Sequence, residues 1–66
     1  MNIRINGKSE PAGKPLNLMD LVLSRGLVPG HVVLEHNLRI VPRDEWQDIA
    51  LKEGDNIEIV SFVGGG

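Results

Sequence analysis

Hydrophobic and polar residues alternate at the start of the chain in the pattern of a short β-hairpin. Met1–Ile5 alternates apolar and polar side chains with the two-residue period of a half-buried strand. Asn6 and Gly7 follow, and this pair favours a tight hairpin turn. A second, more polar strand is therefore predicted over Lys8–Ala12. We expect it at a sheet edge, because Pro11 has no N–H to give to the hydrogen-bond ladder.

One long helical pattern comes next. Asn17 suits the N-cap position, and Gly26 ends the helix just after Arg25. The apolar face of this helix is predicted to pack on the sheet. The residues that define and widen that face are Leu18, Met19, Leu21, Val22 and Leu23.

The second half of the chain predicts further short strands and one helical turn. Val32–Leu34 and Leu38–Val41 have the composition of strands, with a turn at His36 and Asn37. The segment 43–47 suits a single 3₁₀ turn whose Trp46 covers one end of the core. A turn at Gly54 and Asp55 leads into a final strand, residues 56–63. The order is typical of an α+β, β-grasp (ubiquitin-like) fold: a mixed four- to five-stranded sheet with one main helix packed across one face.

Composition limits the chain to a single small domain. Its 66 residues, 41% hydrophobic and 24% charged, predict one globular unit over residues 1–63 and a flexible glycine tail over residues 64–66. Cysteine is absent, so disulfides and thiolate zinc sites are excluded. A core this small leaves little room for a catalytic cleft, and an autonomous enzyme is not expected.

The charges are unevenly distributed. Residues 1–43 hold six Lys/Arg and three Asp/Glu (+3), residues 44–66 hold one Lys and six Asp/Glu (−5), and the sum is −2. The acidic part is either a solvated face or a docking patch for a basic partner. The net charge gives no footprint for nucleic acid. No segment has the length and hydrophobicity of a membrane span or signal peptide, so we expect a cytoplasmic location.

No catalytic or metal-binding constellation is recognisable. His31 and His36 are five residues apart across a predicted strand, on opposite faces, unlike a chelating pair on a helix. The serines have no acid–base partner at a recognisable spacing, and no calcium-loop pattern surrounds the acidic residues of the 43–48 segment. We therefore expect neither a catalytic residue nor a bound metal.

The end of the chain combines a glycine tail with an apolar strand face. Gly64, Gly65 and Gly66 lose much conformational entropy when ordered, and without side chains they are able to enter a narrow channel of another protein. In the preceding strand Ile57 and Ile59 share the predicted core face. The opposite face carries Glu58, Val60 and Phe62 and is predicted to be a docking surface for a partner. The alternatives are a frayed terminus without function and a β-bulge that buries Phe62.

The whole chain resembles the ThiS family of sulfur-carrier proteins. The resemblance rests on Ile40-Val41-Pro42-Arg43-Asp44-Glu45-Trp46, on Asn37 ahead of it, on Gly54-Asp55 before the last strand and on the terminal Gly65-Gly66. The chain departs from the usual family pattern at Glu58, where many members carry a hydrophobic residue.

The resemblance implies a definite chemistry and set of partners. The Gly66 carboxylate is adenylated with ATP and Mg by a ThiF-like adenylating enzyme. Sulfur from a donor such as a cysteine desulfurase then gives a thiocarboxylate, which supplies thiazole synthase (ThiG) in thiamine biosynthesis. The chain itself binds no cofactor and acts as a protein co-substrate. Two alternatives stay open: a MoaD-like carrier for molybdopterin synthesis and a ubiquitin-like interaction or tagging module.

Overall fold

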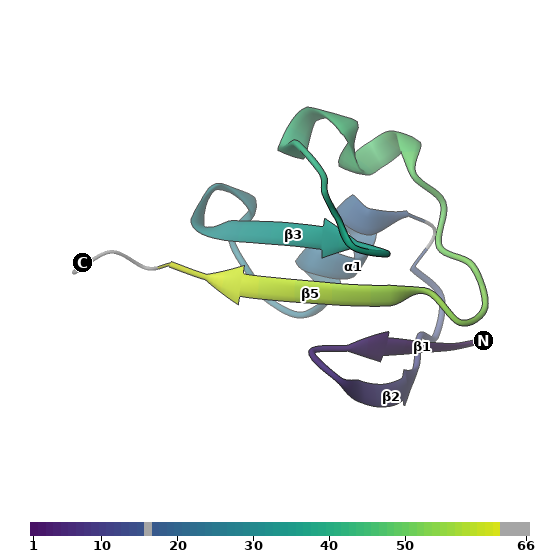
Figure 1. Ribbon diagram of the computed structural model, residues 1–66. Helices are drawn as coiled ribbons and strands as arrows, with labels where there is room; N and C mark the ends of the chain where they lie inside the picture. The colour runs from purple at the N-terminus through teal and green to yellow at the C-terminus, as the bar shows by residue number, and fades with distance from the viewer. Residues whose placement is uncertain (16, 63–66) are drawn as a thin grey trace.

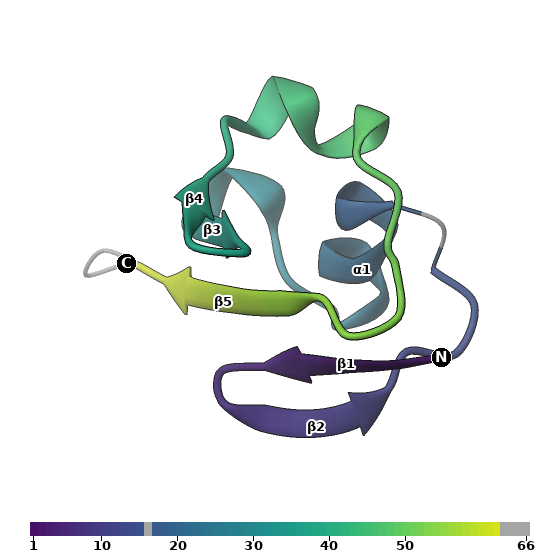
Figure 2. The ribbon, with the colours of Figure 1, turned by 45° about the vertical axis from the view of Figure 1, so that its right-hand side comes forward.

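Five strands form one mixed sheet in the order β2-β1-β5-β3-β4 (Figures 1 and 2). The computed structural model describes residues 1–15 and 17–62. Central strand β5 runs parallel to β1, and the other neighbouring pairs are antiparallel. The strands are β1 (Asn2–Ile5), β2 (Lys8–Pro11), β3 (Val32–His36), β4 (Arg39–Ile40) and β5 (Asn56–Ser61). This arrangement confirms the predicted β-grasp fold with five strands, and β2 lies at an edge as Pro11 predicted.

Helix α1 (Leu18–Ser24) packs on one face of this sheet (Figure 2). The Asn17 side chain accepts a hydrogen bond from the Asp20 N–H at 2.8 Å, which confirms the predicted N-cap. Leu21 and Val22 are buried, whereas Leu23 is 54% exposed. The prediction that Leu23 widens the core face was wrong, because a helix of seven residues buries only a narrow stripe and Leu23 lies outside it.

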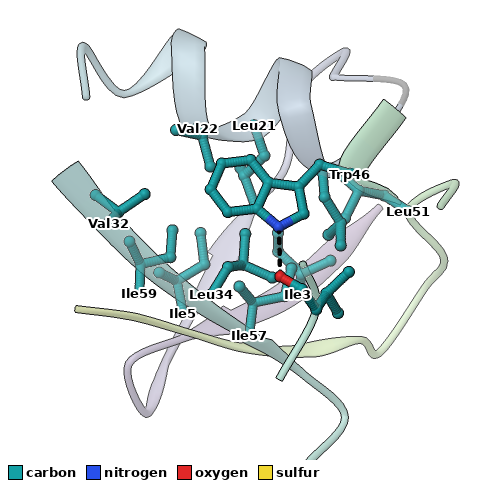
Figure 3. Close-up of a cluster of buried hydrophobic side chains, with 12 residues drawn as sticks. Ile3, Ile5, Leu21, Val22, Val32, Leu34, Trp46, Leu51, Ile57 and Ile59 are labelled. Carbon is teal, nitrogen blue, oxygen red and sulfur yellow. Dashed lines mark hydrogen bonds between the residues drawn. The ribbon is translucent and has the colours of Figure 1, made fainter. Parts of the chain in front are cut away.

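The core lies between α1, the inner sheet face and the 3₁₀ helix η2 (Arg43–Asp48), as Figure 3 shows. Trp46 on η2 is 1% exposed, and its Nε1–H donates to the Val41 carbonyl at 2.8 Å. The predicted role of Trp46 as a cover over the core is confirmed. A shorter 3₁₀ helix, η1 (Pro29–His31), leads into β3. The buried apolar side chains are Ile3, Ile5, Leu18, Leu21, Val22, Val32, Leu34, Val41, Trp46, Leu51, Ile57 and Ile59.

Both hairpins close with two-residue turns in the left-handed region. Asn6 (φ 51°) and Gly7 (φ 84°) join β1 to β2, as predicted. The turn between β3 and β4 consists of Asn37 (φ 49°) and Leu38 (φ 72°), one residue later than predicted. The prediction failed because Asn37 occupies the first turn position, as Asn6 does. Its partner is a leucine, a residue type that gives no turn signal.

The last strand is described as far as Ser61, followed by Phe62. The sequence predicted a strand reaching Val63, and Val63 lies outside the described residues. The same holds for Gly64, Gly65 and Gly66, on which the predicted tail depends.

Candidate functional site

The outer face of β5 is exposed in the way its alternation predicts. Ile57 and Ile59 point into the core, with 0% and 8% of their surfaces exposed. Glu58 is half-buried on the opposite face, and Val60 is 59% exposed there. The strand therefore separates a packing face from a face that α1 does not cover (Figure 2).

Phe62 continues this exposed face beyond the end of β5. Its N–H donates to the carbonyl of His31 at 2.8 Å, so backbone pairing with the β3 side persists past Ser61. The Phe62 side chain is 53% exposed. The alternative in which a β-bulge buries Phe62 is therefore excluded for the described residues. The exposed side chains of Val60 and Phe62 are able to make apolar contacts with a partner.

Neighbouring strands extend the exposed face with residues that the sequence analysis did not assign to it. Val33 on β3 is the cross-strand partner of Val60, and Glu35 is the partner of Glu58. Ile40 on β4 pairs with Glu35 in turn and is 64% exposed. The alternation of residues 32–36 already places Val33 and Glu35 on the face opposite the core. Assigning them to the same surface as Val60 also requires knowing that β3 lies next to β5, which the sequence does not show.

A buried polar cluster fixes the beginning of β5. The carboxylate of Asp55, 5% exposed, accepts hydrogen bonds from Asn37 Nδ2 at 3.1 Å and from the Lys52 N–H at 2.8 Å. His36 Nε2 lies 3.1 Å from the same carboxylate. The N–H of Asn56 donates to Asn37 Oδ1 at 2.8 Å, so the cluster ties the β3–β4 turn to the first residue of β5.

The pKa of Asp55 lies below its ordinary value. Burial alone would raise this pKa, because it disfavours the charged carboxylate. The hydrogen bonds from the Asn37 side chain, the Lys52 N–H and His36 outweigh that effect, since each favours the ionised form. Asp55 is therefore held as an anion whose role is to position β5.

The structure also shows where the two histidines lie. His31 lies exposed in η1, while His36 contacts Asp55. Within residues 1–15 and 17–62, no group of three or more His, Cys, Asp or Glu side chains is arranged to hold a metal ion. In the same residues, no helix has the length and apolar character needed to cross a membrane.

A small β-grasp protein with an exposed sheet face next to a strand that leads to terminal glycines is the architecture of a ubiquitin-like carrier. Residues 3–66 match the model described as the ThiS family. The chain belongs to the ThiS family of sulfur carriers of thiamine biosynthesis. This confirms the resemblance seen in the sequence and favours it over the MoaD-like and tagging alternatives.

Individual relatives agree with this assignment. The chain is 35% identical over 65 residues to the "Sulfur carrier protein ThiS" of Bacillus subtilis, covering 97% of this chain and 98% of that protein. It superimposes on the crystal structure of the thiamine biosynthesis protein ThiS from Geobacter metallireducens with a TM-score of 0.83, 30% identity and full coverage of both chains.

A longer relative joins the same region to an enzyme. All of this chain is 35% identical to part of a "Thiazole synthase" from Paramagnetospirillum magneticum. The chain spans only 20% of the length of that protein.

Proposed function

We propose that the chain carries sulfur on the carboxyl carbon of Gly66 and delivers it for thiazole formation. The observation that carries this proposal is the ThiS family match, which extends through residue 66 and so includes the terminal glycines. The chain then acts as a protein co-substrate, and the catalytic groups belong to its partners.

Activation is needed because a carboxylate resists nucleophiles. A terminal carboxyl has a pKa of about 3.3–3.7 and is an anion at neutral pH. In the first step an oxygen of the Gly66 carboxylate attacks the α-phosphorus of ATP, and pyrophosphate leaves. The product is an acyl adenylate, whose AMP is a good leaving group. The adenylating enzyme supplies the magnesium and the cationic groups that stabilise the developing charge.

The second step replaces AMP by sulfur. A hydrosulfide equivalent attacks the Gly66 carbonyl carbon, the bond to AMP breaks, and a thiocarboxylate and a proton are formed. The chain contains no cysteine, so it has no thiol on which to hold a persulfide. The terminal carbonyl is accordingly the carrier position in this proposal, with Gly64 and Gly65 presenting it to each partner.

Three partners follow from this sequence of steps. A ThiF-like enzyme performs the adenylation. A donor such as a cysteine desulfurase provides the sulfur as a persulfide, which a reducing thiol converts to the hydrosulfide level while that thiol is oxidised to a disulfide. A thiazole synthase (ThiG) consumes the thiocarboxylate, and the relative that joins both parts in one protein supports this partnership. Because activation uses ATP, we place these steps in the cytoplasm. The exposed face that includes Glu58, Val60 and Phe62 is the proposed docking surface.

Intact-mass spectrometry tests the carrier proposal. The chain is incubated with its adenylating enzyme, ATP and a sulfur donor, and the expected mass gain equals the replacement of one oxygen by sulfur. A variant with one residue added after Gly66 should show no gain. A matched variant with one residue added before Met1 should react as the unmodified chain does. An unchanged mass with partners that are active on another carrier would refute the proposal.

A further inference from the structure

Two glutamates are paired on the exposed side of the sheet. Glu35 on β3 and Glu58 on β5 are direct cross-strand partners, and both are half-buried. The Asn37 N–H donates to the Asn56 carbonyl, and the Phe62 N–H donates to the His31 carbonyl. Backbone hydrogen bonds join every second residue pair of an antiparallel ladder, so the backbones of Glu35 and Glu58 also form such a pair. Their Cα atoms are therefore about 5.5 Å apart, and their side chains lie on one face.

No cation of the described residues neutralises this pair. The ion pairs in that part of the chain join Arg25 to Glu10, His36 to Asp55 and Arg39 to Glu45. On the neighbouring strand β1, the guanidinium of Arg4 donates to the Gly7 carbonyl at 3.2 Å. Like charges directly opposite in a sheet destabilise it, so the two glutamates oppose the strand pairing that holds them together.

Apolar side chains flank the glutamate pair on two sides. Val33 and Val60, themselves cross-strand partners, lie next to the pair along the strands. Ile40 lies beside Glu35 on β4. All three are exposed. A partner that covers them excludes water from the carboxylates, and a cation placed there then interacts with both more strongly than it would in open solvent.

We propose that this face receives an arginine of thiazole synthase, whose guanidinium bridges Glu35 and Glu58 next to the apolar side chains of Val33, Val60 and Ile40. The inference rests on the proposed carrier function. A planar guanidinium has five N–H donors and is able to contact two carboxylates at once, whereas a lysine offers a single point charge.

Two observations favour thiazole synthase as the partner on this face. One relative holds the matched region and a thiazole synthase in one protein, so the two are made to act together there. In this chain, β5 carries both Glu58 and Val60 and leads directly toward the residue proposed to react. Glu58 precedes Gly66 by eight positions, so at most about 29 Å of chain separates the glutamate pair from the residue that the partner binds.

Calorimetric titration with purified thiazole synthase tests the proposal. Glu35→Gln and Glu58→Gln should each raise the Kd about tenfold, because each removes one charged hydrogen bond. The double variant should weaken binding by less than the product of the two single effects, since one arginine serves both carboxylates. The matched controls are Asp44→Asn, Asp48→Asn and their double variant, which change net charge equally at exposed positions of η2 and should leave the Kd unchanged.

Unfolding measurements separate binding from structure. The Gln variants should unfold at the same or a higher denaturant concentration than the unmodified chain, because like-charge repulsion is relieved while affinity falls. Glu58→Asp keeps the charge and should retain more affinity than Glu58→Gln.

Several outcomes would overturn the arginine proposal while leaving the carrier function intact. These are an unchanged Kd in both Gln variants, no measurable binding of the unmodified chain, or lowered stability in the Gln variants. A loss of affinity only toward the adenylating enzyme would show that the occupant is wrong. Failure of the carrier function is a separate result, namely the absence of the thiocarboxylate in the unmodified chain.

Discussion

Asn6 and Ile59 lie 53 positions apart and are joined by two hydrogen bonds through the Asn6 carboxamide. Asn6 Oδ1 accepts from the Ile59 N–H at 2.8 Å, and Nδ2 donates to the Ile59 carbonyl at 3.2 Å. The Asn6 N–H also donates to the Ile57 carbonyl at 2.9 Å. The side chain thus takes the place of one further residue of β1, because its carboxamide offers Ile59 an N–H donor and a carbonyl acceptor, as a peptide group would. Hydrogen bonding to β5 therefore extends by two residues, from Ile57 to Ile59, although the backbone turns away at Gly7.

Asn6→Gly should weaken the attachment of β5 at Ile59 without disturbing the hairpin turn. Glycine tolerates the φ of 51° at this position but lacks both side-chain hydrogen bonds. We expect a loss of about 1–3 kcal/mol in the free energy of unfolding. Faster amide exchange at Ile59 should accompany it. Asn6→Asp keeps the acceptor for the Ile59 N–H and should therefore lose less protection. Equal exchange rates at Ile59 in Asn6→Gly and the unmodified chain would contradict this role.

Local chemistry explains which parts of the structure the sequence predicted. Asn6 and Gly7 are residues that a tight turn requires, and alternation alone placed Ile57 in the core and Val60 outside it. The contribution of Glu35 to the exposed face was missed because it depends on pairing with a strand more than twenty positions away. The docking role of that face remains a prediction.

Leu38 occupies a strained turn position that a smaller residue would relieve. Its φ of 72° is unfavourable for a branched side chain, and the side chain is 84% exposed, so it gains little from packing. Leu38→Gly should raise the free energy of unfolding by about 1 kcal/mol. Leu38→Ala retains the Cβ and should show a much smaller gain. Urea denaturation of the three proteins checks the order, and an equal effect of both substitutions would show that strain is not the cause.

Acid should destabilise the protein partly through Asp55. Because the pKa of Asp55 is lower in the folded state, its contribution is fully present above the ordinary value of 3.8. That contribution is lost as the pH falls through the lower folded pKa. Asp55→Asn should cost about 1–3 kcal/mol at neutral pH. Asp55 accepts from Asn37 on one oxygen and from Lys52 on the other, and asparagine replaces one of these oxygens by an NH2 donor.

The pH dependence distinguishes this contribution from packing alone. Below pH 3.8 the stability difference between Asp55→Asn and the unmodified chain should shrink, as protonation removes the same interaction from the latter. Asp48→Asn, at an exposed position on η2, is the control and should leave the neutral-pH stability unchanged. A stability gap for Asp55→Asn that stays constant through the acidic range would show that ionisation of Asp55 is not responsible.

Phe62 provides the test of the docking surface, because the chain offers a control of matching exposure. Phe62 is 53% exposed next to the end of β5, and Leu23 is 54% exposed on α1, outside the sheet face. Phe62→Ala should weaken binding to the adenylating enzyme by about 1–3 kcal/mol, the range of an aromatic interface residue. Leu23→Ala should leave this affinity unchanged. Both substitutions should alter the free energy of unfolding by less than about 0.5 kcal/mol, as expected for exposed side chains. A titration of the enzyme with each variant, paired with chemical denaturation, measures both quantities. A large loss of stability with unaltered affinity in Phe62→Ala would mean that Phe62 belongs to the packed structure, and the partner would then have to engage a different part of the chain.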